Sequence, residues 1–240
     1  MVALASLLIF MGAMPFTEHS LATLGPDLKD PPREFSVGPL WVWNDLLTPE
    51  ELVSSLDTLA AAHIRQVWVH PRPGLMTPYL SDEWFNLWEA TLAAARERGM
   101  LVWIYDENSY PSGFAGGYVP EAMPESRALG LKIYERPAVD ASAPNVLAVY
   151  EKTPRGYRDV TEQLRRHAPD PMTRYTVALM EQAKTSPWYA GKYHVDLVRP
   201  GVTEKFLEIT LGASRARLGE QFGGMTPGIF TDEPHLHPCG

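Results

Sequence analysis

Two pairs of adjacent carboxylates follow short apolar runs in this sequence. Asp106 and Glu107 come directly after one run, and Asp232 and Glu233 come after another. An apolar run of this length that ends in acids is typical of a buried parallel strand, which delivers side chains to one edge of a sheet. Carboxyl groups gathered at such an edge can perform acid–base chemistry, because one donates a proton while another stays ionised.

Two further apolar runs also end in polar side chains. Asn44 and Asp45 follow the first run of the chain, and His70 and Arg72 lie at the end of the second. Each has a structural alternative: Asn44 and Asp45 could only start a turn, His70 could be a core histidine, and Arg72 could pair with a carboxylate that follows the third run. The acids Asp232 and Glu233 are harder to assign to structure alone, because a buried carboxylate is costly unless it is paired or used.

Helix signals alternate with these apolar runs. Thr48, Pro49 and Glu51 place a capping residue, a proline at the first helical position and a glutamate three residues after the cap. Two independent rules therefore agree on a helix start. A second helix is predicted to begin after Ser81 and to end at Gly99, whose lack of a side chain suits a helix C-terminus.

The remaining elements are predicted in the same way. A glycine-rich loop at residues 108–117 follows the third strand, and a helix over residues 203–222 precedes the fourth. Strands that alternate with helices predict a parallel sheet covered by helices. Between residues 131 and 199 three apolar runs are separated by turn-forming residues without a helical stripe, which predicts an inserted β-rich lobe.

Four such strands fit the first half of an eightfold β/α barrel or a small open sheet. A complete barrel needs about 250 residues, and this chain of 240 residues ends at Gly240, soon after a strand. We therefore expect an α/β fold that is a partial TIM-type barrel, its first half, with the lobe inserted. The expected organisation is a leader at 1–30, the partial barrel at 31–130 and 200–240, and the lobe at 131–199.

Composition restricts the function. The net charge of −8 and the absence of a Lys/Arg cluster exclude a nucleic-acid partner. A single cysteine, Cys239, excludes an internal disulfide framework. Residues 1–22 contain an apolar run and a small-residue cleavage pattern but no preceding basic residue, so export to the periplasm or medium and a cytoplasmic location both stay open. That run is too short to span a membrane.

Aromatic residues are the second clue to chemistry. Trp41, Trp43, Trp68, Trp103 and Tyr105 all lie on predicted strands. Flat rings near a barrel mouth suit the faces of sugars, while carboxylate, amide, imidazole and guanidinium groups bond hydroxyls. Packing inside the barrel is the structural alternative for most of these rings. The third strand's loop adds a tyrosine and a phenylalanine at 110 and 114.

Six motifs in order resemble those of bacterial glycoside hydrolases similar to family 106, the α-L-rhamnosidases. They begin at Pro31, Trp43, His70, Tyr105, Pro111 and Phe230, and read PPREF, WND, HPRPGL, YDE, PSGFAGG and FTDEP. The resemblance implies a catalytic β/α barrel with β-domains downstream, and a carboxylate general acid working with a second carboxylate. No residue pattern requires a cofactor or a metal, although the resemblance adds calcium as a cofactor to test.

The chemistry expected is therefore hydrolysis of an O-glycosyl bond, with an oligosaccharide or glycoside as the partner. Glu233 is the candidate acid, since the negative charge of Asp232 favours a protonated neighbour if both face the site. Because side chains alternate along a strand, we expect Glu233 to point inward and Asp232 toward Arg72 or a hydroxyl. The second carboxylate is Glu107, Asp106 or a residue on a later strand beyond Gly240. We prefer the residue on a later strand. In that case this chain alone would bind sugar weakly and would not hydrolyse it. The catalytic candidates are Glu233, Asp232 and Glu107, and the substrate-binding candidates are Asn44, Asp45, His70, Arg72, Tyr105, Asp106, Tyr110, Ser112 and Phe114.

Two other hypotheses about the function compete with glycoside hydrolysis. A metal-dependent barrel hydrolase would use His70, Asp232, His235 and His237 as ligands, although the His-x-His pair is then expected on the first strand. A non-catalytic carbohydrate-binding barrel, or a truncated inactive one, would use the same mouth without turnover.

Overall fold

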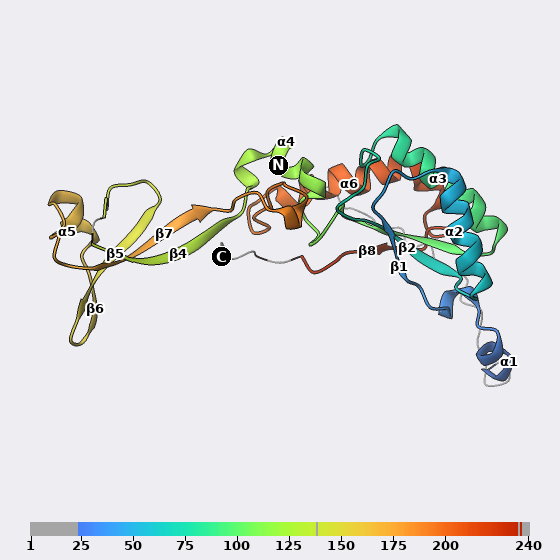
Figure 1. Ribbon diagram of the computed structural model, residues 1–240, viewed down its shortest axis with the longest axis horizontal. Helices are drawn as coiled ribbons and strands as arrows, with labels where there is room; N and C mark the ends of the chain where they lie inside the picture. The colour runs from blue at the N-terminus through green and yellow to red at the C-terminus, as the bar shows by residue number, and fades with distance from the viewer. Residues whose placement is uncertain (1–23, 138, 235, 237–240) are drawn as a thin grey trace, which may run out of the picture.

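The computed structural model describes residues 24–137, 139–234 and 236, so residues 1–23 of the predicted leader at 1–30 lie outside the described residues. Figure 1 shows an elongated molecule with a helix-covered parallel sheet at one end and an antiparallel lobe at the other. The fold is therefore mixed α/β, as the alternating pattern predicts. The described strands form two separate four-stranded sheets, and a closed barrel is not formed by this part of the chain.

The first sheet is parallel and has the strand order β1-β2-β3-β8. Its neighbours pair in register, with Trp68 beside Trp103 and Tyr105 beside Phe230. The polar residues that follow the strands therefore reach the same edge of the sheet. The strands are β1 (Leu40–Trp43), β2 (Gln66–Pro71), β3 (Leu101–Tyr105) and β8 (Ile229–Phe230).

The helices that cover this sheet begin as the sequence predicts. Helix α2 (Pro49–Ala61) starts with a complete capping box, in which Thr48 accepts from the Glu51 amide and the Glu51 carboxylate accepts from the Thr48 amide. Helix α3 (Asp82–Glu97) is capped by Ser81, which accepts from the Trp84 amide at 3.2 Å. Both caps fix where each helix leaves the sheet edge.

Helix α6 (Val202–Leu218) ends four residues earlier than the predicted position 222. Its buried row includes Thr210 and Ser214, whose hydroxyls donate to carbonyls one turn back at 2.8 and 2.9 Å. Arg217 joins α6 to α3 through ion pairs with Asp82 and Glu89. Figure 1 shows α2, α3 and α6 on one side of the parallel sheet.

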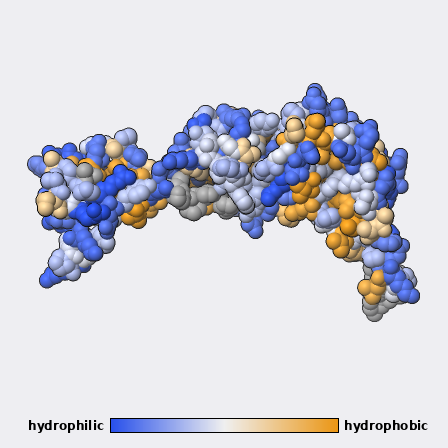
Figure 2. All heavy atoms as spheres, viewed as in Figure 1, coloured by the Kyte–Doolittle hydropathy of each residue, from blue (hydrophilic) through white to orange (hydrophobic). Residues whose placement is uncertain are grey.

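The main core lies between the sheet and these helices. Trp43 is completely buried there, with its ring 5.0 Å from that of Trp84 and 6.1 Å from that of Trp88. The opposite face of the sheet carries Trp68 and Trp103 as a stacked pair with ring centroids 5.2 Å apart. That face is open to solvent in part, and hydrophobic residues are visible on this end of the molecule in Figure 2.

A glycine allows β8 to approach this stacked pair. A Cβ atom on Gly228 would lie 2.5 Å from the ring of Trp103, closer than real Cβ contacts. The start of the fourth strand therefore needs a residue without a side chain at this position.

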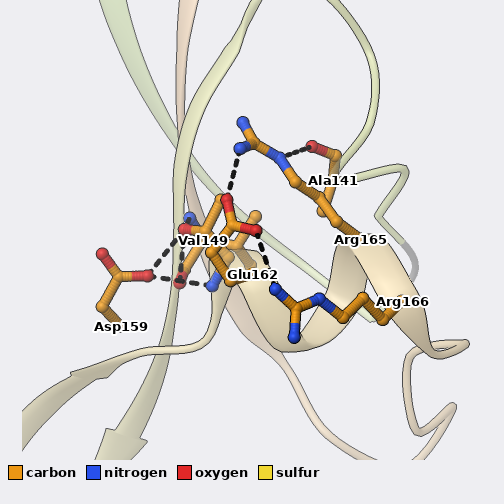
Figure 3. A network of polar contacts seen from close by, with 7 residues as sticks. Ala141, Val149, Asp159, Glu162, Arg165 and Arg166 are labelled. Atoms are coloured by element: carbon orange, nitrogen blue, oxygen red, sulfur yellow. Dashed lines mark hydrogen bonds and ion pairs between the residues drawn. The ribbon is translucent and has the colours of Figure 1, made fainter.

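The lobe is an antiparallel sheet with the strand order β4-β7-β5-β6. It confirms that the region near 131–199 is rich in strands, although it also contains helix α5 (Thr161–Arg166), which the sequence pattern did not predict. Asp159 accepts from the Thr161 amide and hydroxyl and so fixes the start of α5, while Glu162 pairs with two arginines (Figure 3). The strands are β4 (Leu129–Arg136), β5 (Val146–Thr153), β6 (Gly156–Asp159) and β7 (Tyr175–Gln182).

Short elements connect these units. Helix α4 and the turn η2 continue the loop after β3, and η4 lies at the base of the lobe. Among the described residues, no helix is both long and apolar enough to cross a membrane. The short elements are α1 (Leu24–Lys29), η1 (Arg33–Phe35), η2 (Ala115–Gly117), α4 (Tyr118–Ala122), η3 (Pro124–Ser126), η4 (Pro187–Tyr189) and η5 (Gly219–Gln221).

The buried indole of Trp43 gives a test of this core. We expect Trp43→Ala to lower the free energy of unfolding by about 3–5 kcal/mol, because it removes a large buried ring and leaves a cavity. Trp188→Ala is the matched control: this indole is 59% exposed, and its loss should change the free energy of unfolding by less than about 0.5 kcal/mol. Urea unfolding followed by circular dichroism measures both. Equal effects of the two substitutions would contradict the placement of the core.

Candidate functional site

Three rings form a row across the carboxyl ends of β2, β3 and β8. His70 stacks on Tyr105 with ring centroids 3.8 Å apart, and Tyr105 stacks on Phe230 at 5.8 Å. His70 is 4% exposed, and neither ring nitrogen has a hydrogen-bond partner among the described residues. Burial, reinforced by the positive charge of Arg72, lowers the pKa of His70 from 6.5 to about 4, so the imidazole is neutral near neutral pH.

Tyr105 connects this row to the fourth strand. Its hydroxyl donates to Asp232 Oδ2 at 2.8 Å, while the carbonyl oxygen of Ser109 lies 3.2 Å away. Burial and the bond to Asp232 raise the pKa of Tyr105 well above its usual value, so the phenol stays protonated and can donate. Asp232 thus points toward a neighbouring hydroxyl, one of the two alternatives that the sequence left open for it.

Asp106 joins the loop after β3 to the segment after β8. One of its oxygens accepts from the Ser112 hydroxyl at 2.6 Å, and the other accepts from the Thr231 hydroxyl at 2.7 Å. Ser112 also accepts from the backbone amide of Asp232 at 2.9 Å. Burial raises the pKa of Asp106, and the two hydroxyl donors act in the opposite direction. The buried carboxylate therefore positions the chain that carries Asp232.

Glu107 turns the opposite way, into the glycine-rich loop. It is completely buried, and five backbone amides, from Asn108, Gly113, Phe114, Ala115 and Gly116, donate to its two oxygens at 2.5–3.0 Å. Burial raises its pKa to about 8, whereas these amides lower it. Every one of these partners is a donor, so the amides favour the ionised carboxylate while burial favours the protonated one.

Glu233 lies at the mouth of the site. Its Oε2 accepts from the hydroxyl of Tyr110, which comes from the loop after β3. The sequence reading treated Asp232 and Glu233 as buried, and this is wrong: Asp232 is half-buried and Glu233 is exposed, because β8 ends at Phe230. The buried acids are instead Asp106 and Glu107.

The other predicted residues divide into two groups. Arg72 is half-buried, and within the described residues its guanidinium makes no ion pair or hydrogen bond. The alternatives in which it pairs with Asp106, Glu107 or Asp232 are therefore not formed. Asn44 and Asp45 are exposed after β1, and Asp45 accepts from the next backbone amide at 2.8 Å, which is the turn-forming alternative.

Phe114 is completely buried beside Tyr189 and His194, away from solvent. The structure thus brings together His70, Tyr105, Asp106, Tyr110, Ser112, Asp232 and Glu233, and directs Glu107 and Phe114 into the loop's own core.

Two residues at this edge were missed by the sequence reading. Thr231 belongs to the motif that contains Asp232, and its hydroxyl could have been counted as a donor to a neighbouring acid. Trp188 stands at the base of the lobe, 42 residues before the nearest motif in sequence, which begins at Phe230. It lines a pocket of about 260 Å³ together with Arg72, Pro73, Tyr110 and Pro187. Only the folded chain brings these residues together.

Metal ligands were tested against the same geometry. Across residues 24–137, 139–234 and 236, no group of three or more His, Cys, Asp or Glu side chains is arranged to hold a metal ion. His235 and His237, two of the alternative ligands, lie outside the described residues.

Comparisons with known proteins give one distant structural match. No protein-family model and no curated protein matches the sequence. A structure described as a rhamnosidase from Novosphingobium sp. PP1Y matches with a TM-score of 0.34 and 16% identity, over 53% of this chain and 12% of that chain. The chain thus spans a small part of that rhamnosidase's length. A match at this TM-score and identity does not assign the chain to a family.

The lowered pKa of His70 predicts a pH dependence of stability. Between pH 6.5 and 4 the imidazole binds more protons in the unfolded chain than in the folded one, so the free energy of unfolding should fall as the pH falls through this range. We expect His70→Gln to remove this part of the dependence. Urea unfolding at a series of pH values measures it, with the exposed His167→Gln as control. A parallel dependence in wild type and His70→Gln would contradict the assignment.

The amides around Glu107 predict a second effect. Glu107→Gln places a donor group among donors and removes the negative charge, and we expect a loss of about 2–4 kcal/mol in the free energy of unfolding. Limited proteolysis should also cut earlier within residues 108–117. Glu204→Gln, on the exposed first turn of α6, is the matched control. An effect no larger than that of the control would show that the amides do not need the carboxylate.

Proposed function

We propose that this chain belongs to the catalytic region of a glycoside hydrolase that cleaves terminal α-L-rhamnose or a related sugar. The observation that carries the proposal is the pair of acids after β8, each accepting a hydrogen bond from a tyrosine hydroxyl: Asp232 from Tyr105 and Glu233 from Tyr110. The sugar is suggested by the six motifs that resemble α-L-rhamnosidases.

Glu233 is the proton donor in this proposal. It is exposed at the carboxyl edge of a parallel sheet, the edge where β/α enzymes bind their substrates, so a glycosidic oxygen can approach it. Tyr110 fixes the direction of its carboxyl group. Protonation of the leaving oxygen by this group would accompany cleavage of the bond to the anomeric carbon, through an oxocarbenium-like transition state.

Asp232 is the partner carboxylate among the described residues. Its oxygen accepts from Tyr105, whose protonated phenol is a fixed donor, and it is half-buried rather than closed off. The distance between the two carboxyl groups around a bound sugar decides whether the configuration at the anomeric carbon is retained or inverted. Retention needs about 5–5.5 Å and inversion about 6.5–9.5 Å. A carboxylate from an additional strand remains the alternative partner.

Asp106 and Glu107 take positioning roles in this scheme. Both are buried, and their oxygens accept bonds from the loop after β3 and from Thr231. Glu107 was one of the alternatives for the second catalytic carboxylate, and our proposal gives it instead the role of ordering the loop that presents Tyr110.

The fold proposal that accompanies this function is a partial TIM-type barrel. The four parallel strands in chain order, with helices on one face and aromatic rings on the other, are the arrangement that the first half of such a barrel would have. The open face with Trp68 and Trp103 corresponds in this proposal to the barrel interior.

Substitution of Glu233 tests the acid. We expect Glu233→Gln to slow hydrolysis of an alkyl α-L-rhamnoside by about 10²–10⁴-fold, the usual contribution of a general acid. A dinitrophenyl α-L-rhamnoside, whose leaving group needs little protonation, should be affected far less. Initial rates with both substrates, measured on the natural full-length protein, give the comparison. Activity within a few-fold of wild type on the alkyl substrate would remove Glu233 from this role.

Two controls separate the roles of the acids. Glu220→Gln, on the short turn after α6, should leave both rates unchanged, because this acid lies outside the site. Asp232→Asn should slow both substrates equally, and added azide should restore part of the rate if Asp232 works on the anomeric carbon. A loss that is large for the alkyl substrate and small for the dinitrophenyl substrate, without rescue, would assign Asp232 to the support of Glu233 instead.

Non-catalytic sugar binding is the second candidate. The observation that favours it is the burial of Asp106 and Glu107, which leaves two solvent-accessible acids, on successive residues, in the described part of the site. Calorimetry with L-rhamnose beside the activity assay distinguishes the two functions, since binding without any hydrolysis supports this one.

A further inference from the structure

We propose that Arg72, Tyr110 and Trp188 form a second sugar subsite beside Glu233, and that it takes a pyranose that carries a carboxylate, a uronic acid. This inference rests on the proposed function for its meaning, since the uronic acid would be the residue next to the sugar that is cleaved. Its geometry stands independently, in the pocket of about 260 Å³ that these side chains line.

Trp188 is the flat wall of this pocket. The indole is 59% exposed, whereas the next residue, Tyr189, is 5% exposed and packs on Phe114. Ser186 accepts from the Trp188 amide at 3.2 Å and Pro187 begins the single turn of η4, so the backbone that carries the indole is fixed. Large exposed aromatics on a rigid turn are suited to binding, because little side-chain freedom is lost when a ligand stacks on them.

Tyr110 connects the pocket to the candidate acid. Its ring meets that of Trp188 edge to face, with centroids 6.0 Å apart and planes at 86°. The hydroxyl of the same side chain donates to Glu233. A ligand that fills the pocket would therefore contact a residue that also fixes the direction of the candidate acid, and this places the pocket directly next to the proposed point of cleavage.

Arg72 decides the chemical class of the ligand. Its guanidinium is half-buried and, within the described residues, makes no ion pair or hydrogen bond. A planar guanidinium binds a carboxylate through two parallel hydrogen bonds, which are stronger than bonds to neutral hydroxyls. A neutral sugar has no carboxylate to pair with the positive charge of Arg72, so we expect the ligand to be a sugar acid.

The size and charge of the region agree with a single sugar ring. The pocket lies just below the range of about 300–1,000 Å³ that holds drug-sized ligands, so it suits one pyranose. Nucleotides, which also combine a flat ring with negative charge, are disfavoured by the net charge of −8. Their phosphates would carry more negative charge than the uronate and would lie close to Asp232 and Glu233.

Two sugars that differ at one carbon test the inference. D-galacturonate and D-galactose are identical except for the carboxylate at C6, and calorimetric titration of the full chain measures both. We expect wild type to bind galacturonate about tenfold more tightly or better, as a charge-assisted bidentate contact implies. Arg72→Gln should abolish the difference between the sugars. Trp188→Ala should weaken the binding of both.

Controls make each outcome decisive. Tyr157→Ala removes an aromatic that is 60% exposed on the far hairpin of the lobe, and it should bind both sugars like wild type. Circular dichroism verifies that each variant is folded. Equal affinity for the two sugars, no binding of either by the folded wild type, or a Trp188→Ala variant indistinguishable from Tyr157→Ala would each overturn the subsite.

The Glu233→Gln variant separates this inference from the proposed function. Galacturonate preference in a protein that shows no hydrolysis of any rhamnoside would retain the subsite and reject the catalytic role. Hydrolysis that depends on Glu233, without discrimination between galacturonate and galactose, would retain the catalytic role and reject the subsite.

Discussion

The buried carboxylate of Asp106 is the interaction on which the rest of the site depends. Strand β8 pairs with β3 through only two residues, Ile229 and Phe230. The acids follow that pairing. Beyond it the chain is held by a backbone hydrogen bond from the Ser112 amide to the Asp232 carbonyl at 2.9 Å, and by hydrogen bonds from the Thr231 and Ser112 hydroxyls to Asp106. A side-chain network thus continues the sheet beyond its last paired residue, at the place where chemistry is proposed.

The neighbouring acid solves a different problem. Glycine-rich loops have many backbone amides and few side chains with which to satisfy them. Glu107 supplies two oxygens to five amides at once and so gives residues 108–117 a single conformation. Because successive side chains point to opposite sides of a strand's end, Asp106 faces β8 while Glu107 faces the loop. Two adjacent acids therefore order the two segments that form the site.

Local patterns predicted the parts of the fold that local physics determines. The capping box at Thr48 and the serine cap at Ser81 form as expected, since each involves atoms within one turn. The alternation of strands with helices along the chain also predicted the parallel sheet. Burial of the acids could not be predicted, because it depends on where β8 ends relative to β3. The contact of Trp188 with Tyr110 depends on how the chain that leaves the lobe packs against the loop after β3, and the spacing of residues in the sequence does not predict this packing.

The two acids after β8 differ in what determines their positions. Asp232 accepts from Tyr105, which is 2% exposed on strand β3 and stacked between His70 and Phe230. Glu233 accepts from Tyr110, which lies in the loop and borders the pocket. A rigid sheet therefore fixes one carboxylate, while a loop whose surface meets the ligand fixes the other. The group proposed to deliver the proton is thus the one whose orientation a bound sugar can adjust, and its partner keeps a constant position.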